Sequence, residues 1–100
     1  MPLSASQKRH LRALAHPLRP VVLVGQAGVT TALLREADLA LQAHELIKLK
    51  ISASDRELRD EMIERISEQC GAETVQRIGH TVVLYRPNPK KRQPLVIPPD

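Results

Sequence analysis

The chain has 100 residues, a formal net charge of +4, and 15 lysine and arginine residues against 11 aspartate and glutamate residues. This length predicts one domain with a small core, and the absence of Phe and Trp excludes the aromatic base-stacking surfaces of RRM and OB-fold proteins. A single cysteine excludes an intrachain disulfide, and no apolar segment reaches the ~20 residues that span a bilayer, so we expect a cytoplasmic protein with no membrane partner.

The first predicted elements are a helix over residues 5–15 and a strand over residues 21–24. Ser4 and Gln7 have the spacing of a capping box, and Pro17 ends the helix because the residue before a proline avoids helical backbone angles. The strand consists of four consecutive apolar residues. Such a run is typical of a strand buried on both faces, so we predict an interior strand.

A short loop with two glycines, residues 25–28 (Gly-Gln-Ala-Gly), joins this strand to a helix over residues 31–43. Glycines allow a partner to approach the backbone closely, and the N-terminus of the helix, capped by Thr30 or Thr31, favours an anion such as phosphate. Glycine pairs of this kind also occur in ordinary strand-to-helix turns. The loop lacks the further residues of nucleotide-binding motifs, so nucleotide binding is not favoured.

The next predicted strand, residues 45–51, alternates apolar residues with Lys48 and Lys50. Two lysines at i and i+2 share one face of a strand, and lysine is rarely buried. They either line a binding surface or coat a solvent-exposed sheet face, and we favour the binding surface.

The remaining elements are a helix from Ser54 to residue 70, with Ser54 and Glu57 as a second capping box, and strands over residues 74–78 and 81–86 that form a hairpin. The resulting order is α-β-α-β-α-β-β. It predicts a single α/β domain with a four-stranded mixed sheet and helices packed on it.

Charge is unevenly distributed along the chain. Residues 1–35 contain five basic and no acidic residues, residues 77–92 contain five more basic and no acidic residues, and residues 55–73 contain seven acidic residues and three arginines. Such separation favours one surface that attracts phosphates, although uneven solvated charge remains the alternative. We predict a folded domain over residues 1–87 and a mobile, proline-rich basic tail over residues 88–100.

The candidate binding residues are the two-glycine loop and the basic side chains near it. Arg12 offers a fork of donors, and the cations beside it on the first helix either bind phosphate or coat a solvated helix face. The four histidines lack metal-ligand spacing and no nucleophile motif is present, so we predict no catalytic residue, metal, cofactor or small-molecule substrate. The predicted RNA-binding residues are Lys8, Arg9, Arg12, Gly25, Gln26, Ala27, Gly28, Thr30, Lys48, Lys50 and Arg86.

Several blocks of sequence resemble the stand-alone bacterial CRM-domain proteins (YhbY-like). The blocks are QKxxLRxLAH (7–16), PVVLVGQAGVT (20–30), HELIKLKI (44–51), VQxIG (75–79) and LYRP (84–87). The resemblance implies a fold similar to the C-terminal domain of translation initiation factor three, RNA binding without catalysis, and association with precursors of the large ribosomal subunit. It also implies that the loop at residues 25–28 contacts RNA. Many relatives have a basic residue within this loop, where this chain has Gln26 and Ala27.

We therefore expect a monomeric RNA-binding protein that docks on structured ribosomal RNA during assembly of the large subunit. Because aromatic residues are scarce, we expect contacts mainly to the RNA backbone and shape. The alternative is a protein-interaction module that contacts a basic ribosomal protein through the acidic helix at residues 54–70.

Overall fold

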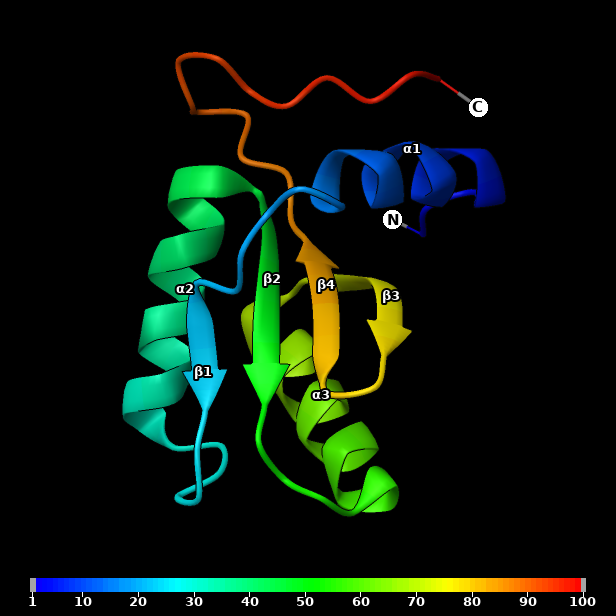
Figure 1. Ribbon diagram of the computed structural model, residues 1–100. Helices are drawn as coiled ribbons and strands as arrows, with labels where there is room; N and C mark the ends of the chain where they lie inside the picture. The colour runs from blue at the N-terminus through cyan, green and yellow to red at the C-terminus, as the bar shows by residue number, and fades with distance from the viewer. Residues whose placement is uncertain (1, 100) are drawn as a thin grey trace.

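The computed structural model describes residues 2–99, which form three helices and one four-stranded sheet (Figure 1). The predicted element order and the mixed α/β architecture are confirmed. The elements in chain order are α1 (Ala5–Ala15), β1 (Val22–Val24), α2 (Thr31–His44), β2 (Leu46–Ile51), α3 (Arg56–Cys70), β3 (Glu73–Ile78) and β4 (Thr81–Tyr85). None of these helices is both long enough and apolar enough to cross a membrane.

The strands lie in the order β1-β2-β4-β3, with β1 parallel to β2 and the other neighbours antiparallel. The prediction that the first strand is interior is wrong, because β1 lies at an edge and has one neighbour. Val22 and Val24 are buried, whereas Val21 and Leu23 are 49% and 66% exposed. The prediction failed because a run of apolar residues does not show whether another element covers the second face of the strand.

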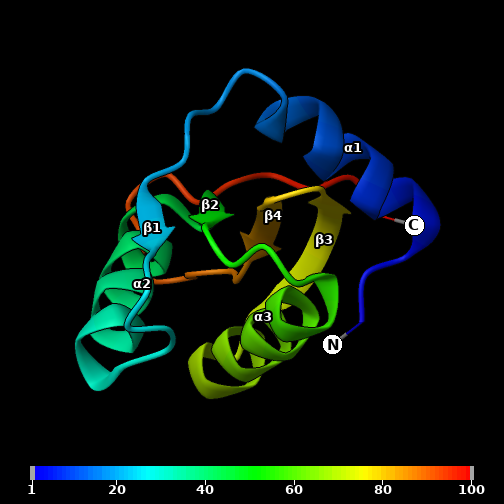
Figure 2. The same cartoon turned by 60° about the horizontal axis from the view of Figure 1, so that its bottom comes forward.

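The helices cover the two faces of the sheet unequally (Figure 2). Helices α2 and α3 pack on one face and form the larger core with Val22, Val24, Ile47, Leu49, Ile51, Val82 and Leu84. Helix α1 packs on the other face, where Leu11 and Ala15 meet Leu46, Val75, Val83 and Tyr85. These two sets alternate along β2 and β4, as the period of a strand requires. One face is therefore fully covered, and the other is covered at one end only.

The helix ends follow the sequence signals with one exception. The capping box of Ser4 and Gln7 is present, and the Thr30 hydroxyl accepts a hydrogen bond from the amide of Leu33 at 3.0 Å. The prediction that Ser54 caps α3 is wrong, since Asp55 is the N-cap and its carboxylate accepts from the amide of Glu57 at 3.2 Å. A carboxylate is favoured there because it also complements the positive end of the helix dipole.

Glu45 separates α2 from β2, so the strand begins one residue later than predicted. Its φ of 62° lies in the left-handed region, and its amide donates to the carbonyl of Leu41 at 2.8 Å, which closes the helix. The side chain is 1% exposed and its carboxylate accepts hydrogen bonds from the amides of Asn88 (2.7 Å) and Leu95. Glu45 therefore fixes the start of the C-terminal segment against the end of α2.

The C-terminal segment has defined contacts along its length, whereas the sequence predicts a mobile tail. Leu95 and Ile97 pack against the α1 side of the core, and the Gln7 amide group donates to the carbonyl of Pro98 at 3.3 Å. Lys90 and Arg92 of the segment are exposed, and Lys91 is half-buried. Mobility in solution stays a prediction, but the segment runs past α1 at the end of the sheet that this helix covers (Figure 1).

Candidate nucleic-acid interface

The part of the sheet that α1 leaves uncovered is called here the open half of the sheet, and it carries Leu23, Lys48, Lys50 and Thr81. Lys48 pairs with Val83 and Lys50 with Thr81 on β4, while Lys50 also pairs with Leu23 on β1. The predicted alternation of β2 is confirmed, because Ile47, Leu49 and Ile51 are buried while the lysines face the other side. Two cations thus project from a rigid, hydrogen-bonded strand.

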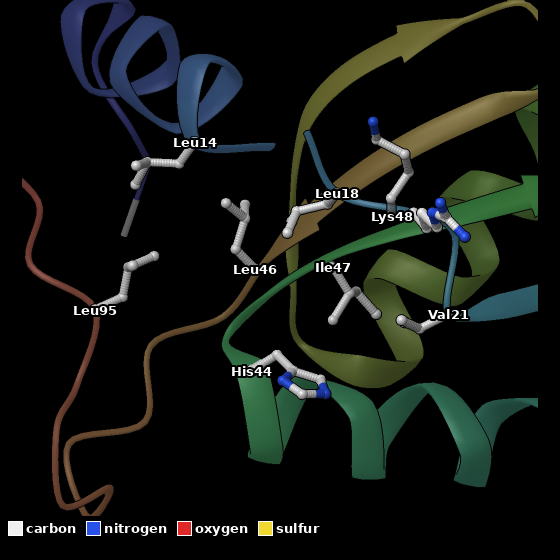
Figure 3. A pocket seen from close by; sticks show the side chains of 9 residues that line it. Leu14, Leu18, Val21, His44, Leu46, Ile47, Lys48 and Leu95 are labelled. Atoms are coloured by element: carbon white, nitrogen blue, oxygen red, sulfur yellow. The ribbon is translucent and has the colours of Figure 1, made fainter. Parts of the chain in front are cut away.

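Two grooves meet at Lys48. The apolar groove, of about 440 Å³, lies between the end of α1, the segment before β1 and the start of β2 (Figure 3). It is lined by Leu14, Leu18, Arg19, Val21, His44, Leu46, Ile47, Lys48 and Leu95. The polar groove, of about 210 Å³, is lined by His16, Lys48, Gln76, Ile78, Thr81 and Val83. Among residues 2–99, no acidic side chain lines either groove, so both offer positive potential to an anion.

Helix α1 extends this basic surface. His16 lines the polar groove, and the ammonium nitrogen of Lys48 lies 3.5 Å from its carbonyl oxygen. Residues four apart share a helix face, so Lys8 and Arg12 continue the row that His16 ends. Arg9 is exposed on the outer side of the helix. Lys8, Arg12, Lys48 and Lys50 therefore lie toward one side of the molecule, whereas Arg9 does not share their row.

The loop at residues 25–28 lies beyond the end of β1, at the end of the sheet opposite to α1 (Figure 1). The amide of Gly28 donates to the carbonyl of Gly25 at 3.0 Å, and Gly28 has a φ of 74° that strongly favours glycine. A Cβ at Gly25 would meet no atom within 4 Å. Gln26 and Ala27 are exposed at the tip. Gly28 is thus needed for the turn, while Gly25 leaves open space beside the backbone.

The helix after the loop adds a further preference for anions. Its first turn contains no acidic residue, and Thr30 caps it, so the hydroxyl of Thr30 already has a partner. The loop and the start of α2 lie at the β1 edge of the sheet, next to the strand that contains Lys50 (Figure 1). This geometry allows one extended ligand to contact both the loop and the open half of the sheet.

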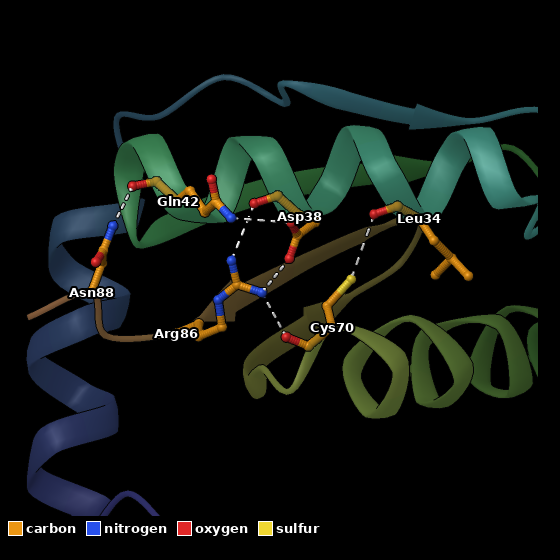
Figure 4. Close-up of polar contacts among 6 residues, drawn as sticks. All are labelled: Leu34, Asp38, Gln42, Cys70, Arg86 and Asn88. Atoms are coloured by element: carbon orange, nitrogen blue, oxygen red, sulfur yellow. Dashed lines mark hydrogen bonds and ion pairs between the residues drawn. The ribbon is translucent and has the colours of Figure 1, made fainter. Parts of the chain in front are cut away.

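Arg86 is the one predicted RNA-binding residue that lies away from this surface (Figure 4). It follows β4 on the α2–α3 side, and its guanidinium donates to the Asp38 carboxylate at 2.7 Å and to the carbonyl of Cys70 at 2.7 Å. Its side chain is 20% exposed. These contacts join α2, α3 and β4, so they favour a structural role. Strand alternation could have predicted this position, because Arg86 lies two residues after the buried Leu84 and therefore points to the same face of the sheet.

Cys70 lies beside the Arg86 contact. Burial of the thiol, and secondarily the negative charge of Asp38, raise its pKa above the usual value. The sulfur lies 3.8 Å from the carbonyl of Leu34 and packs among apolar side chains. Such a thiol is a packed core group and a weak nucleophile.

Of the residues that line the two grooves, the sequence reasoning placed only Lys48 in the site and missed the polar and charged His16, Arg19, His44, Gln76 and Thr81. Arg19 lies between two prolines, where no helical or strand period assigns it a face, and Gln76 lies next to an irregularity in the pairing of β3 with β4. Within residues 2–99, no group of three or more histidine, cysteine or acidic side chains is placed to hold a metal ion.

The acidic residues of α3 lie away from the lysines of β2, because α3 packs on the opposite face of the sheet. Asp60 forms a 3.5 Å ion pair with Arg77, while Glu57, Glu61 and Glu64 are exposed. The molecule therefore has a basic side and an acidic side, a separation that keeps the potential at the open half of the sheet positive.

Comparison with known proteins identifies relatives of nearly the whole chain. The sequence model of the CRS1 / YhbY (CRM) domain matches residues 3–86. A Haemophilus influenzae protein named "RNA-binding protein" is 48% identical over 86% of this chain and 87% of its own length. The "Probable RNA-binding protein YqeI" of Bacillus subtilis is 35% identical over 91% of this chain and 95% of its own length.

A solved structure has the same fold. The solution structure of a hypothetical protein from Staphylococcus aureus, described as a candidate RNA-binding protein, superposes with a TM-score of 0.82. The two sequences are 33% identical, and the match covers 97% of this chain and 100% of the other.

Proposed function

Because this chain belongs to the CRS1 / YhbY (CRM) domain family, we propose that it binds RNA through the open half of its sheet, the α1 row of Lys8 and Arg12, and the loop at residues 25–28. The observation that carries the proposal is the position of Lys48, which lines both grooves and shares its strand face with Lys50. Lys8 and Arg12 lie on the α1 row that ends at His16, which lines the polar groove. The names of the relatives support RNA as the ligand.

The contacts we propose are mainly to phosphates. Lys48 and Lys50 are held on a strand, so they present two charges at a fixed separation, whereas Arg12 can bind one phosphate through two parallel hydrogen bonds. Binding of each phosphate releases condensed counterions, so several modest contacts together give useful affinity. The loop adds backbone amides and space at Gly25, which let a phosphate approach closely.

We further propose that the RNA is structured ribosomal RNA in precursors of the large subunit, and that the protein acts in the cytoplasm as a non-catalytic monomer. A binder that recognises backbone and shape gains specificity from a folded RNA that exists in one assembly state and not in another. The resemblance of the sequence blocks to bacterial CRM-domain proteins supports this choice of RNA.

Sedimentation of ribosomal particles tests the proposal. We expect the protein to co-sediment with immature large subunits and to be scarce on mature ribosomes. Arg12→Glu combined with Lys48→Glu should release it to the top of the gradient, because both changes reverse charge on the proposed surface. Arg56→Glu combined with Arg65→Glu on α3 is the matched control and should leave sedimentation unchanged. Equal occupancy of mature and immature particles would contradict an assembly role.

A second candidate function uses the opposite side of the molecule. The exposed carboxylates of α3, including Glu57, Glu61 and Glu64, could contact a basic ribosomal protein. Treatment of a pull-down with ribonuclease separates the two functions, since partners bridged by RNA would be lost and direct protein partners would remain.

A further inference from the structure

We propose that the apolar groove receives an unpaired base of the bound RNA, so that the protein recognises a base as well as the backbone. This inference rests on the proposed RNA-binding function and makes it more specific. Such a groove would favour RNA with a bulged or looped-out nucleotide over a continuous duplex. This preference goes beyond the backbone and shape contacts expected from the sequence.

The walls of the groove are aliphatic and come from separate segments of the chain. Leu14 lies in the last turn of α1, Leu18 and Val21 lie in the segment before β1, and Leu46 begins β2 (Figure 3). Leu14 and Leu18 remain 38% and 39% exposed. A concave patch of exposed leucine and valine marks a binding site more often than a plain surface does. The flat faces of a base can pack against such walls.

The rim of the groove is cationic, which indicates an occupant that combines an apolar part with negative charge. Arg19 and Lys48 line the groove, and none of its lining residues is acidic. A nucleotide has this combination, because its base is flanked by phosphates. The guanidinium plane of Arg19 can also stack on a base, which compensates for the scarcity of aromatic rings. A segment of a basic protein would be repelled at the same rim.

Continuity with the phosphate-binding surface favours RNA over an acidic peptide. Lys48 lines both the apolar and the polar groove, and Lys50 lies two residues further along the same strand. A phosphate bound at Lys48 therefore places the neighbouring base at the mouth of the apolar groove. The volume of about 440 Å³ lies within the range of sites that hold small organic groups.

The test uses the full chain and two RNA hairpins that are identical except at a single-nucleotide bulge. One hairpin has a 2-aminopurine at the bulge, and the other has an abasic nucleotide, so both present the same phosphates. We expect the protein to bind the hairpin with the base about five- to tenfold more tightly, and to protect the 2-aminopurine fluorescence from acrylamide quenching. Equal affinities, or an unprotected base, would overturn the proposal.

Matched variants locate the effect. Leu14→Gln combined with Leu18→Gln should reduce the ratio of affinities for the two hairpins to near one, while the abasic hairpin is still bound. Leu39→Gln combined with Leu58→Gln changes leucines that are 59% and 42% exposed outside the groove, and should leave the preference intact. An undiminished preference in the groove variant would also overturn the proposal. Failure of the proposed function itself would differ, because the wild-type protein would then bind neither hairpin at low salt.

A second copy of the chain is the main competing occupant. If the wild-type protein dimerises in analytical ultracentrifugation and the Leu14→Gln, Leu18→Gln variant is monomeric, the groove is an interface between copies and the proposal is overturned. We expect both proteins to sediment as monomers.

Discussion

The two faces of the sheet are made by the same strands but are covered differently. On the α2–α3 face, aliphatic side chains from β1, β2 and β4 are buried beneath two helices, and Arg86 joins these helices to the end of β4. On the α1 face, one helix and the C-terminal segment cover one end, and the remainder presents Lys48, Lys50 and exposed apolar residues.

The difference shows how one strand can serve stability and binding together. Along β2, alternate residues belong to the core and to the open half of the sheet, so a change at Leu49 or Ile51 acts on folding, whereas a change at Lys48 or Lys50 acts on the surface. Stability and the proposed RNA binding should therefore be separable residue by residue. The predictions that follow test this separation from the largest expected effect to the smallest.

Reversing the charges of the open half should give the largest effect. Lys48→Glu combined with Lys50→Glu should weaken binding to a ribosomal RNA fragment about a hundredfold at low salt, and should reduce the salt slope by about 2 from a wild-type value of roughly −3 to −5. Fluorescence anisotropy across a salt series measures both. The melting temperature should stay near the wild-type value. A wild-type slope near zero would contradict phosphate contacts.

Removing Arg86 should lower stability and leave RNA affinity unchanged. Arg86→Ala removes the guanidinium donor from the Asp38 carboxylate and from the carbonyl of Cys70, so the free energy of unfolding should fall by about 2 kcal/mol. Denaturant unfolding measures this loss. RNA affinity, corrected for the folded fraction, should be unchanged. Arg86→Lys should recover little, because one ammonium cannot reproduce the fork. A selective loss of RNA binding would place Arg86 in the interface after all.

The two-glycine loop should contribute a moderate part of the affinity. Gly25→Asp places a carboxylate in open space without a backbone penalty, since Gly25 has no contact within 4 Å and no left-handed φ. We expect a loss of affinity of about tenfold from repulsion of a phosphate. Gly25→Asn is the matched neutral control. If both variants bind RNA as the wild type does, the loop is only a turn.

A substitution at Glu45 tests how far this one side chain fixes the C-terminal segment against the α1 face. Glu45→Ala removes the acceptor for the amides of Asn88 and Leu95, so the segment should detach and stability should fall by about 1 kcal/mol. Trypsin should then cleave faster after Lys90, Lys91 and Arg92. Glu64→Ala on α3 is the control. Unchanged cleavage would show that the apolar contacts of Leu95 and Ile97 suffice.

Alkaline pH should have the smallest effect, and it should act on both faces. Burial raises the pKa of the Cys70 thiol on the α2–α3 face, and burial followed by the charge of Glu45 raises the pKa of Tyr85 on the α1 face. The folded state thus favours the protonated forms, and this stability is complete below the unfolded pKa values and is lost as pH rises above about 8.5. The melting temperature should fall slightly over that range, and less in Cys70→Ala.

Most of the fold could be predicted from the sequence because its signals are local. The capping box at Ser4, the glycine at position 71 after α3 and the alternation of β2 each act within a few residues. The position of β1 could not be predicted in the same way. Whether a strand is interior depends on its neighbours in space, and Val22 and Leu23 look alike in the sequence although one is buried and the other exposed.

The candidate site was predictable in part for the same reason. The shared face of Lys48 and Lys50 could be predicted from strand alternation. The structural role of Arg86 could not, because its partners lie 48 and 16 residues away in sequence. The apolar groove had no local signal at all, since Leu14, Val21 and Leu46 come together only through the packing of α1 on the sheet. Long-range contacts of this kind cannot be predicted from local patterns in a single sequence.

The packing of both chain ends against α1 has a topological consequence. Leu3 and Ile97 belong to the same apolar cluster, Gln7 is hydrogen-bonded to Pro98, and the segments at residues 2–4 and 97–99 lie on one side of the molecule (Figure 2). A short linker could therefore close the chain into a ring, and the exposed turn at Gly79 and His80 offers a place to open it again. The architecture would survive such a permutation, and the domain could be inserted into a loop of a host protein as a self-contained cassette.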